Sequence, residues 1–156
     1  PMACGLFGQS VCYQEYNLKN MISNLHPLVI HFPIALFSVA ILFDFLYMIY
    51  KIDDFLASSW WTMLFALISS LAAIATGIID DTLIGHLTTT FPFWINHGVV
   101  QIFSCLIFLG LFIWRTKEPS ILHTKISKLI YIIIGSINLS ILFYGGHLGA
   151  KLAGRV

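Results

Sequence analysis

The chain has 156 residues, of which 58% are hydrophobic and only 10% are charged, and its mean hydropathy is +0.89. About a quarter of the residues of a soluble domain are charged, so this composition indicates a protein built for lipid. The formal net charge of +1 comes with no basic cluster, which argues against nucleic acid as a partner.

The three cysteines form neither a CxxC nor a CxxCH motif, so no zinc knuckle and no covalently attached c-type haem is expected. Cys105 lies in an apolar run and is interpreted as a packing residue. Cys4 and Cys12 are a weak candidate pair for an oxidising compartment. They belong to a polar N-terminal tail, residues 1–24, which shows no cleavable signal peptide and forms at most a short surface helix.

Four apolar runs follow, each long enough to cross a bilayer, which takes about 20 helical residues. Their approximate limits are 27–50, 57–79, 95–114 and 128–149. The connecting loops are short, so neighbouring helices should be antiparallel. The sequence therefore predicts an all-α integral membrane protein, with one antiparallel four-helix bundle over residues 25–156.

The alternating direction of the spans places the histidines. We call the side of the membrane on which the first span begins face A, and the other side face B. The second and fourth spans end at face A, and the third begins there. Only His123 falls at face B, whereas five of the six histidines fall at face A: His26, His31, His86, His97 and His147.

The basic residues predict the orientation, because cytoplasmic loops of membrane proteins are enriched in lysine and arginine. Face A carries three of them, Lys19, Lys151 and Arg155. Face B carries five, namely Lys51, Arg115, Lys117, Lys125 and Lys128. This excess predicts a cytoplasmic face B, with the histidines and both termini in the periplasm.

Helical spacing predicts which residues face the inside of the bundle, since residues three, four and seven apart share a side. On each span, a stripe of small and polar residues leads to a titratable side chain at face A. The predicted stripes are His31, Ala35, Ser38 and Leu42; Ser69, Ala73, Thr76 and Asp80; His97, Gln101, Ser104 and Phe108; and Ser136, Ser140, Phe143 and His147.

Several motifs resemble a family of bacterial four-helix membrane proteins, the domain of unknown function 2231. The opening HPLVIHFPIAL (residues 26–36) is the most specific of them. The second span closes with GIID (77–80), the third opens at His97 and ends at Arg115, and the fourth ends with GGHL (145–148). The resemblance covers residues 25–156 and implies a bacterial inner-membrane protein.

Some members of that family are joined to c-type cytochrome domains, so the resemblance also implies redox partners. The chain departs from the family at its end, where residues 149–156 lack the tyrosine and histidine often found there. If the tyrosine and histidine have a role in other members, that role is either absent from this chain or is taken by His147.

Histidines on facing helices are the ligand set that a membrane-embedded haem b requires. His31 and His97 are the favoured pair, and His26 with His147 is a second pair nearer the surface. Gly145 and Gly146 would leave room for the haem ring, and Lys151 and Arg155 would bind its propionates. The alternative is that no cofactor binds and that the histidines cap helix ends and bond across the bundle.

A copper or zinc ion is a further alternative. His26 and His31 differ by about 140° on an unbroken helix, so they would not share one ion. One of them would instead combine with His86, His97 or His147. Asp80 and Asp81 either orient a ligand histidine or pair with nearby cations in a solvated loop.

Two further features are interpreted as structural. Asp44 lies within the first span and needs a partner, for which Lys128 and Tyr131 are the candidates. Small residues recur every four positions along residues 145–154, a spacing used for tight helix contact. They pack either within the bundle, against haem or against another subunit.

Three functions remain. The first is a haem b-binding membrane subunit that passes electrons at face A. The second is a non-catalytic accessory subunit of a larger respiratory-type membrane complex, and the third is transport or sensing of a metal or proton. The expected partners are the lipid bilayer and other membrane or cytochrome subunits. No nucleophile with a base, phosphate loop or paired carboxylates points to a hydrolase or transferase.

Overall fold

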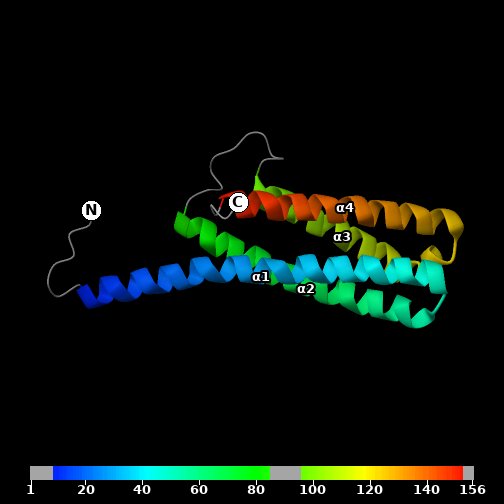
Figure 1. Ribbon diagram of the computed structural model, residues 1–156, viewed down its shortest axis with the longest axis horizontal. Coiled ribbons are helices and arrows are strands. Elements are labelled where there is room, and N and C mark those ends of the chain that lie inside the picture. Colours follow the sequence, from blue (N-terminus) through cyan, green and yellow to red (C-terminus); the bar gives the residue numbers. More distant parts are fainter. Residues whose placement is uncertain (1–8, 85–95, 153–156) are drawn as a thin grey trace.

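The computed structural model describes residues 9–84 and 96–152, and the side chains of residues 29–78 and 96–151. All regular structure in this part of the chain is helical (Figure 1). The elements are α1 (Gln9–Tyr50), α2 (Asp53–Ile84), α3 (His97–Lys117), the short 3-10 helix η2 (Pro119–Leu122) and α4 (Lys125–Leu152).

The four α-helices are each long and apolar enough to cross a membrane. The segments that meet this criterion are Val29–Tyr50, Asp53–Ile78, His97–Lys117 and Lys125–Lys151. Successive helices run in opposite directions, so that α1 and α3 begin at the same end of the bundle, at which α2 and α4 finish (Figure 1). The predicted all-α membrane bundle is therefore confirmed.

Helix α1 begins at Gln9, well before the apolar run that predicted it, and includes most of the polar tail. It continues through Pro27 and Pro33 without a break in helical structure. Prolines are tolerated in membrane helices because neighbouring groups compensate for the missing backbone bond. His26 and His31 consequently lie on one continuous helix, about 140° apart.

The helix ends have local causes. Asn96 caps α3, since its side-chain oxygen accepts bonds from the backbone N–H groups of Gly98 (3.0 Å) and Val99 (3.3 Å). At the other end of the bundle Lys51 adopts a left-handed conformation (φ 57°), and its N–H bonds the carbonyl of Tyr47 at 2.9 Å. The α1–α2 connection is thereby reduced to a tight turn.

Each helix packs on two neighbours, in the order α1, α2, α3, α4 and back to α1. Helices α1 and α3 are thus diagonal, and their side chains meet at the centre. There the rings of Phe37 and Phe108 stack with centroids 4.0 Å apart, and both residues are fully buried. The centre of the described bundle is filled by side chains.

The predicted inward stripes are only partly right. The α3 stripe is confirmed, because Ser104 and Phe108 are buried, and on α2 Ala73 is buried as well. The stripes on α1 and α4 are wrong, since Leu42 is 52% exposed and Phe143 is 54% exposed. The inward residues of these two helices are instead Phe37, Ala40, Ile41, Asp44 and Tyr47 on α1, and Tyr131, Ile132, Asn138 and Leu142 on α4.

The error has a physical reason. A serine hydroxyl in a membrane helix can donate to a carbonyl of its own helix, so it need not face another helix. Ser38 donates to the carbonyl of Ile34 at 2.7 Å, and Ser140 donates to that of Ser136 at 3.1 Å. Serine spacing is therefore a poor indicator of the inward face.

Candidate functional site

Three of the face A histidines have described side chains, and they lie on three different helices. His31 lies near the start of the membrane-spanning segment of α1, His97 begins that of α3, and His147 lies near the end of that of α4. All three are therefore at the same end of the antiparallel bundle. His123 lies at the opposite end, just before α4. For these residues the predicted grouping at face A is confirmed.

His97 is held against α4. The Asn96 cap makes His97 the first residue of α3, and Nδ1 of its ring bonds the carbonyl oxygen of Gly145 at 2.6 Å. A carbonyl only accepts, so Nδ1 carries the proton. The ring also lies over Gly149, where an added Cβ would stand 2.7 Å from Cε1 of His97. The bond and the close packing together fix the orientation of the imidazole.

The glycines near the end of α4 pack within the bundle. A Cβ on Gly145 would meet Val100 and Gln101 of α3, each at 3.1 Å, and one on Gly146 would meet Ile34 of α1 at 3.4 Å. The predicted small-residue surface thus serves contacts with α3 and α1 at these positions. The space beside Gly145 that was assigned to a haem ring is occupied by α3 side chains.

His31 and His147 have a different environment. Both side chains are exposed at the surface of the bundle. No hydrogen bond or ion pair joins either ring to the described part of the chain. The structure therefore does not pair His31 with His97: His31 faces outwards from α1, whereas His97 contacts α4.

The register of α1 explains the exposure of His31. This residue lies two positions before Pro33 and thirteen before Asp44, which places it about 200–220° from these two buried residues. His31 therefore lies on the outer side of α1.

Other predicted site residues cannot be placed in this way. His86 and Arg155 lie outside the described residues, and the side chains of His26, Asp80 and Asp81 are not described either. Lys151 is exposed on α4. Among the described side chains there is no group of three or more histidine, cysteine, aspartate or glutamate residues that could hold a metal ion.

Among the described side chains, the most extensive polar cluster lies towards face B. Arg115 of α3 forms a buried ion pair with Asp44 of α1, with Nη1 at 2.8 Å from Oδ1 and 3.1 Å from Oδ2. Nη1 also donates to Ser59 of α2 at 2.8 Å and lies 3.5 Å from the hydroxyl of Tyr131 on α4. Nη2 donates to the carbonyl of Leu56 at 2.8 Å. This Asp44–Arg115 cluster joins all four helices.

The cluster tests the predicted partners of Asp44. Tyr131 belongs to it, as expected, but the cation is Arg115 and not Lys128, which is a correction. Arg115 is 6% exposed and Asp44 is fully buried, so each charge depends on the other. A structural role for Asp44 is consistent with these contacts.

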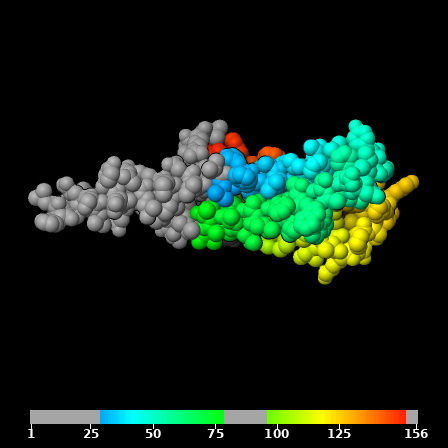
Figure 2. Space-filling view, turned by 90° about the horizontal axis from the view of Figure 1, so that it is seen from below, coloured from blue at the N-terminus to red at the C-terminus, as the bar shows by residue number. Residues whose placement is uncertain are grey.

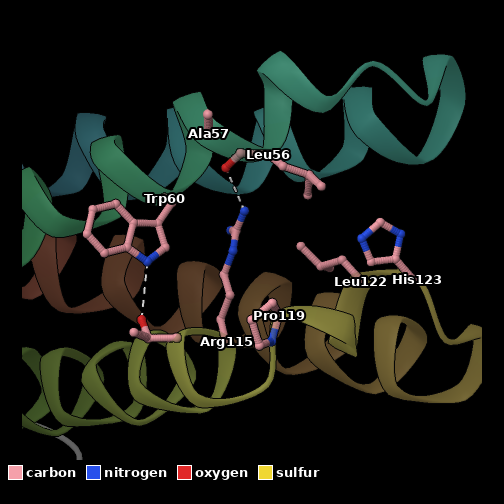
Figure 3. Close-up of a pocket in the computed structure, with 8 residues that line it drawn as sticks. Leu56, Ala57, Trp60, Arg115, Pro119, Leu122 and His123 are labelled. Carbon is pink, nitrogen blue, oxygen red and sulfur yellow. Dashed lines mark hydrogen bonds between the residues drawn. The ribbon is translucent and has the colours of Figure 1, made fainter.

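A groove of about 470 Å³ lies beside the cluster, between the start of α2, the end of α3 and η2 (Figure 3). Its lining residues are Leu56, Ala57, Trp60, Arg115, Thr116, Pro119, Leu122 and His123. Arg115 crosses the groove towards the carbonyl of Leu56, and Trp60 donates to the hydroxyl of Thr116 at 3.2 Å. The walls of the groove are mainly apolar. The contacts of Arg115 indicate that this residue stabilises the fold.

A second buried pair ties α3 to α4 in mid-membrane. Ser104 donates to Oδ1 of Asn138 at 3.0 Å, and Nδ2 of Asn138 donates to the carbonyl of Ser104 at 2.9 Å. Both residues are buried. The pair satisfies groups that would otherwise lack partners in lipid.

Replacing Asn138 by leucine should lower the free energy of unfolding by about 1–3 kcal/mol, because both bonds between the Asn138 amide and Ser104 would be lost. The hydroxyl of Ser104 would keep only its 3.3 Å bond to the backbone carbonyl of residue 138. Thermal unfolding in detergent, followed by circular dichroism, measures the change. Ser140→Ala is the matched control on the same helix, since that side chain is exposed and bonds only its own helix. Equal melting temperatures for the two variants would contradict the assignment.

The comparisons with known proteins agree with this architecture. A family model described as "Predicted membrane protein (DUF2231)" matches residues 22–156, which include all four membrane-spanning segments. No curated protein and no solved structure matches the chain.

Proposed function

The chain belongs to the DUF2231 family of predicted membrane proteins, and we propose that it is a haem b-binding subunit that passes electrons at face A. The observation that carries this proposal is the environment of His97. Its ring lies at the entrance of α3, at one end of an apolar bundle, and is oriented by the Gly145 carbonyl.

The bond between the His97 ring and a backbone carbonyl suits a residue that binds a metal. Histidines that bind metals almost always donate their other ring N–H to a carbonyl or carboxylate, which fixes the tautomer and the direction of the ring. With the proton of a neutral imidazole on Nδ1, Nε2 of His97 is the nitrogen that would bind a haem iron. Gly149, which lacks a side chain, leaves room for the ring in this orientation.

The second ligand is taken to be His26. Helix α1 is diagonal to α3 in the bundle, and His26 is the other histidine of α1 that was predicted at face A. Two imidazoles from opposite helices can approach the two faces of one haem. This choice replaces the initial pairing of His97 with His31, because His31 faces outwards.

The orientation in the membrane and the redox partners are also part of the proposal. The basic residues of face B favour a cytoplasmic position for that end of a bacterial inner membrane, so the haem would exchange electrons on the periplasmic side. The partners would be other membrane or cytochrome subunits. Haem supplies one-electron chemistry, and the protein holds it in place and sets its surroundings.

A second function is an accessory subunit without a cofactor. The observation that favours it is that His97, Ser104 and Gln101 all bond residues of α4, so that polar groups of α3 serve the packing of two helices. In that case the protein would be isolated in a stable larger assembly, and removing the ring of His97 would affect assembly alone.

Haem content separates the two functions. We expect protein purified from haem-replete cells to give a pyridine haemochrome spectrum of haem b. His97→Ala should lose the haem, because an axial ligand is removed, while His123→Ala at the opposite end should keep it. Equal haem content in the two variants, or none in the wild type, would refute the proposal.

A further inference from the structure

Helices α1 and α4 touch along a seam that two contacts define. A Cβ on Gly146 would lie 3.4 Å from Cδ1 of Ile34, and one on Gly135 would lie 2.7 Å from Cδ1 of Ile41. The inner side of this seam holds Phe37, which is fully buried. The axes of the two helices are therefore close, and the seam has a defined outer side.

The helical register places His31 and His147 on that outer side. His31 precedes Ile34 by three residues and so lies about 60° from the contact line, on the side opposite to Phe37. His147 follows Gly146 by one residue, about 100° away and opposite to the buried Gly145. The exposure of both histidines agrees with these positions.

The two histidines also lie at similar depth. From the contact between Ile34 and Gly146, His31 is displaced towards face A by about 4.5 Å and His147 by about 1.5 Å. They therefore form a pair across the seam, near the membrane surface. Neither ring is bonded to the described part of the chain, so the helix contacts described above do not use their ring nitrogens.

We propose that His31 and His147 bind a transition-metal ion across the outer side of the α1–α4 seam. Imidazole suits copper and zinc, and the affinity of nitrogen sites is highest for Cu²⁺ among the divalent first-row ions. Because the described side chains supply no further carboxylate or thiolate group here, solvent or another ligand completes the coordination.

This site is separate from the proposed haem. The ligands of a haem iron approach from opposite faces of a wide ring, which needs helices with a gap between them. His31 and His147 project from the same side of two helices in contact, an arrangement that a single ion can bridge. The pair therefore goes beyond the proposed function and does not depend on it.

Copper titration of the purified protein tests the site. We expect one tightly bound Cu²⁺ whose electron paramagnetic resonance spectrum shows two nitrogen ligands. His31→Ala and His147→Ala should each lose the tight site, and His123→Ala, the matched control, should keep it. An unchanged stoichiometry and spectrum in the double variant would overturn the proposal, because the copper would then be bound adventitiously elsewhere.

Two further measurements keep the outcome clear. In a background with Cys4, Cys12 and Cys105 replaced by serine, H31C and H147C should be joined by a short bifunctional thiol reagent, and failure to join them would refute the juxtaposition. Haem measured in the same samples should be retained by His31→Ala and His147→Ala. Loss of copper with retention of haem supports the metal site, whereas loss of haem in these variants would overturn its separation from the haem.

Discussion

Replacing Asp44 by alanine is expected to lower the free energy of unfolding by about 3–5 kcal/mol, because it leaves the Arg115 guanidinium buried without its counter-charge. Arg115 is only 6% exposed, so it cannot regain its hydration without a rearrangement of α3. The loss should be large because the cluster includes groups from all four helices. Chemical unfolding in detergent micelles, followed by tryptophan fluorescence, measures it.

Asp53→Ala provides the control, since this acidic residue is exposed in the first turn of α2. Its effect should stay within about 1 kcal/mol. Arg115→Lys should resemble Asp44→Ala, because an ammonium group cannot reproduce contacts that use two nitrogens of a planar guanidinium. If Asp44→Ala were as stable as Asp53→Ala, the cluster would not be the main polar support of the fold.

Replacing Gly149 by alanine should displace the ring of His97. The added Cβ would stand 2.7 Å from Cε1 and 2.8 Å from Nδ1 of that ring, which is tethered to Gly145 and cannot rotate away without losing its bond. Forcing extra atoms into a packed site costs about 1–3 kcal/mol. If His97 binds haem, the substitution should also reduce the haem content.

Two glycines supply controls for this substitution. Gly110→Ala places its Cβ in open space and should raise stability slightly, by up to about 1 kcal/mol, because alanine favours helix. The Cβ of Gly135→Ala would come within 3 Å of only the terminal methyl of Ile41, which can rotate, and would meet Leu111 at an ordinary 3.8 Å. Stability and haem content should therefore fall for Gly149→Ala alone, and a similar fall in all three variants would indicate a general intolerance of α3 and α4.

The membrane spans could be predicted from the sequence because their length and apolar character have a single cause, the thickness of the bilayer. The direction of each helix follows from the short loops, and with it the end at which each histidine lies. The grouping of histidines at one end could therefore be predicted from the number of spans alone. Position along a helix was thus predictable, whereas rotation about its axis was predicted correctly for α3 but not for α1 and α4.

Rotation is difficult to predict because both sides of a membrane helix are apolar, so hydrophobicity does not distinguish the inner face from the lipid face. For this reason the inward faces of α1 and α4 were predicted from serine stripes, and this prediction was wrong. They assigned His31 to the interior, whereas the buried residues Phe37 and Asp44 show that the inner face is on another side of α1.

The partner of Asp44 could have been found from the α3 stripe, which was predicted correctly. Arg115 lies seven residues after Phe108 and eleven after Ser104, so it continues the same inward face. Because Arg115 stands in a basic segment with Lys117, the sequence pattern places it only among the basic residues at the face B end. An arginine in the register of an inward stripe is the signal that was missed.

The two ends of the bundle therefore differ in what their polar residues do. Towards face B, Asp44, Arg115, Ser59 and Tyr131 bond one another and hold the four helices together. At face A, His31 and His147 have no bonds within the described part of the chain, and Nδ1 of His97 bonds the carbonyl of Gly145. The first arrangement suits stability, and the second leaves His31 and His147 for the metal binding proposed above.

The reduced-minus-oxidised absorption spectrum of the purified wild-type protein tests the proposed function most directly. A haem b held by two histidines should give a sharp α band and a shifted Soret band after reduction with dithionite. A colourless protein, isolated from haem-replete cells with its helical circular dichroism intact, would contradict the proposal.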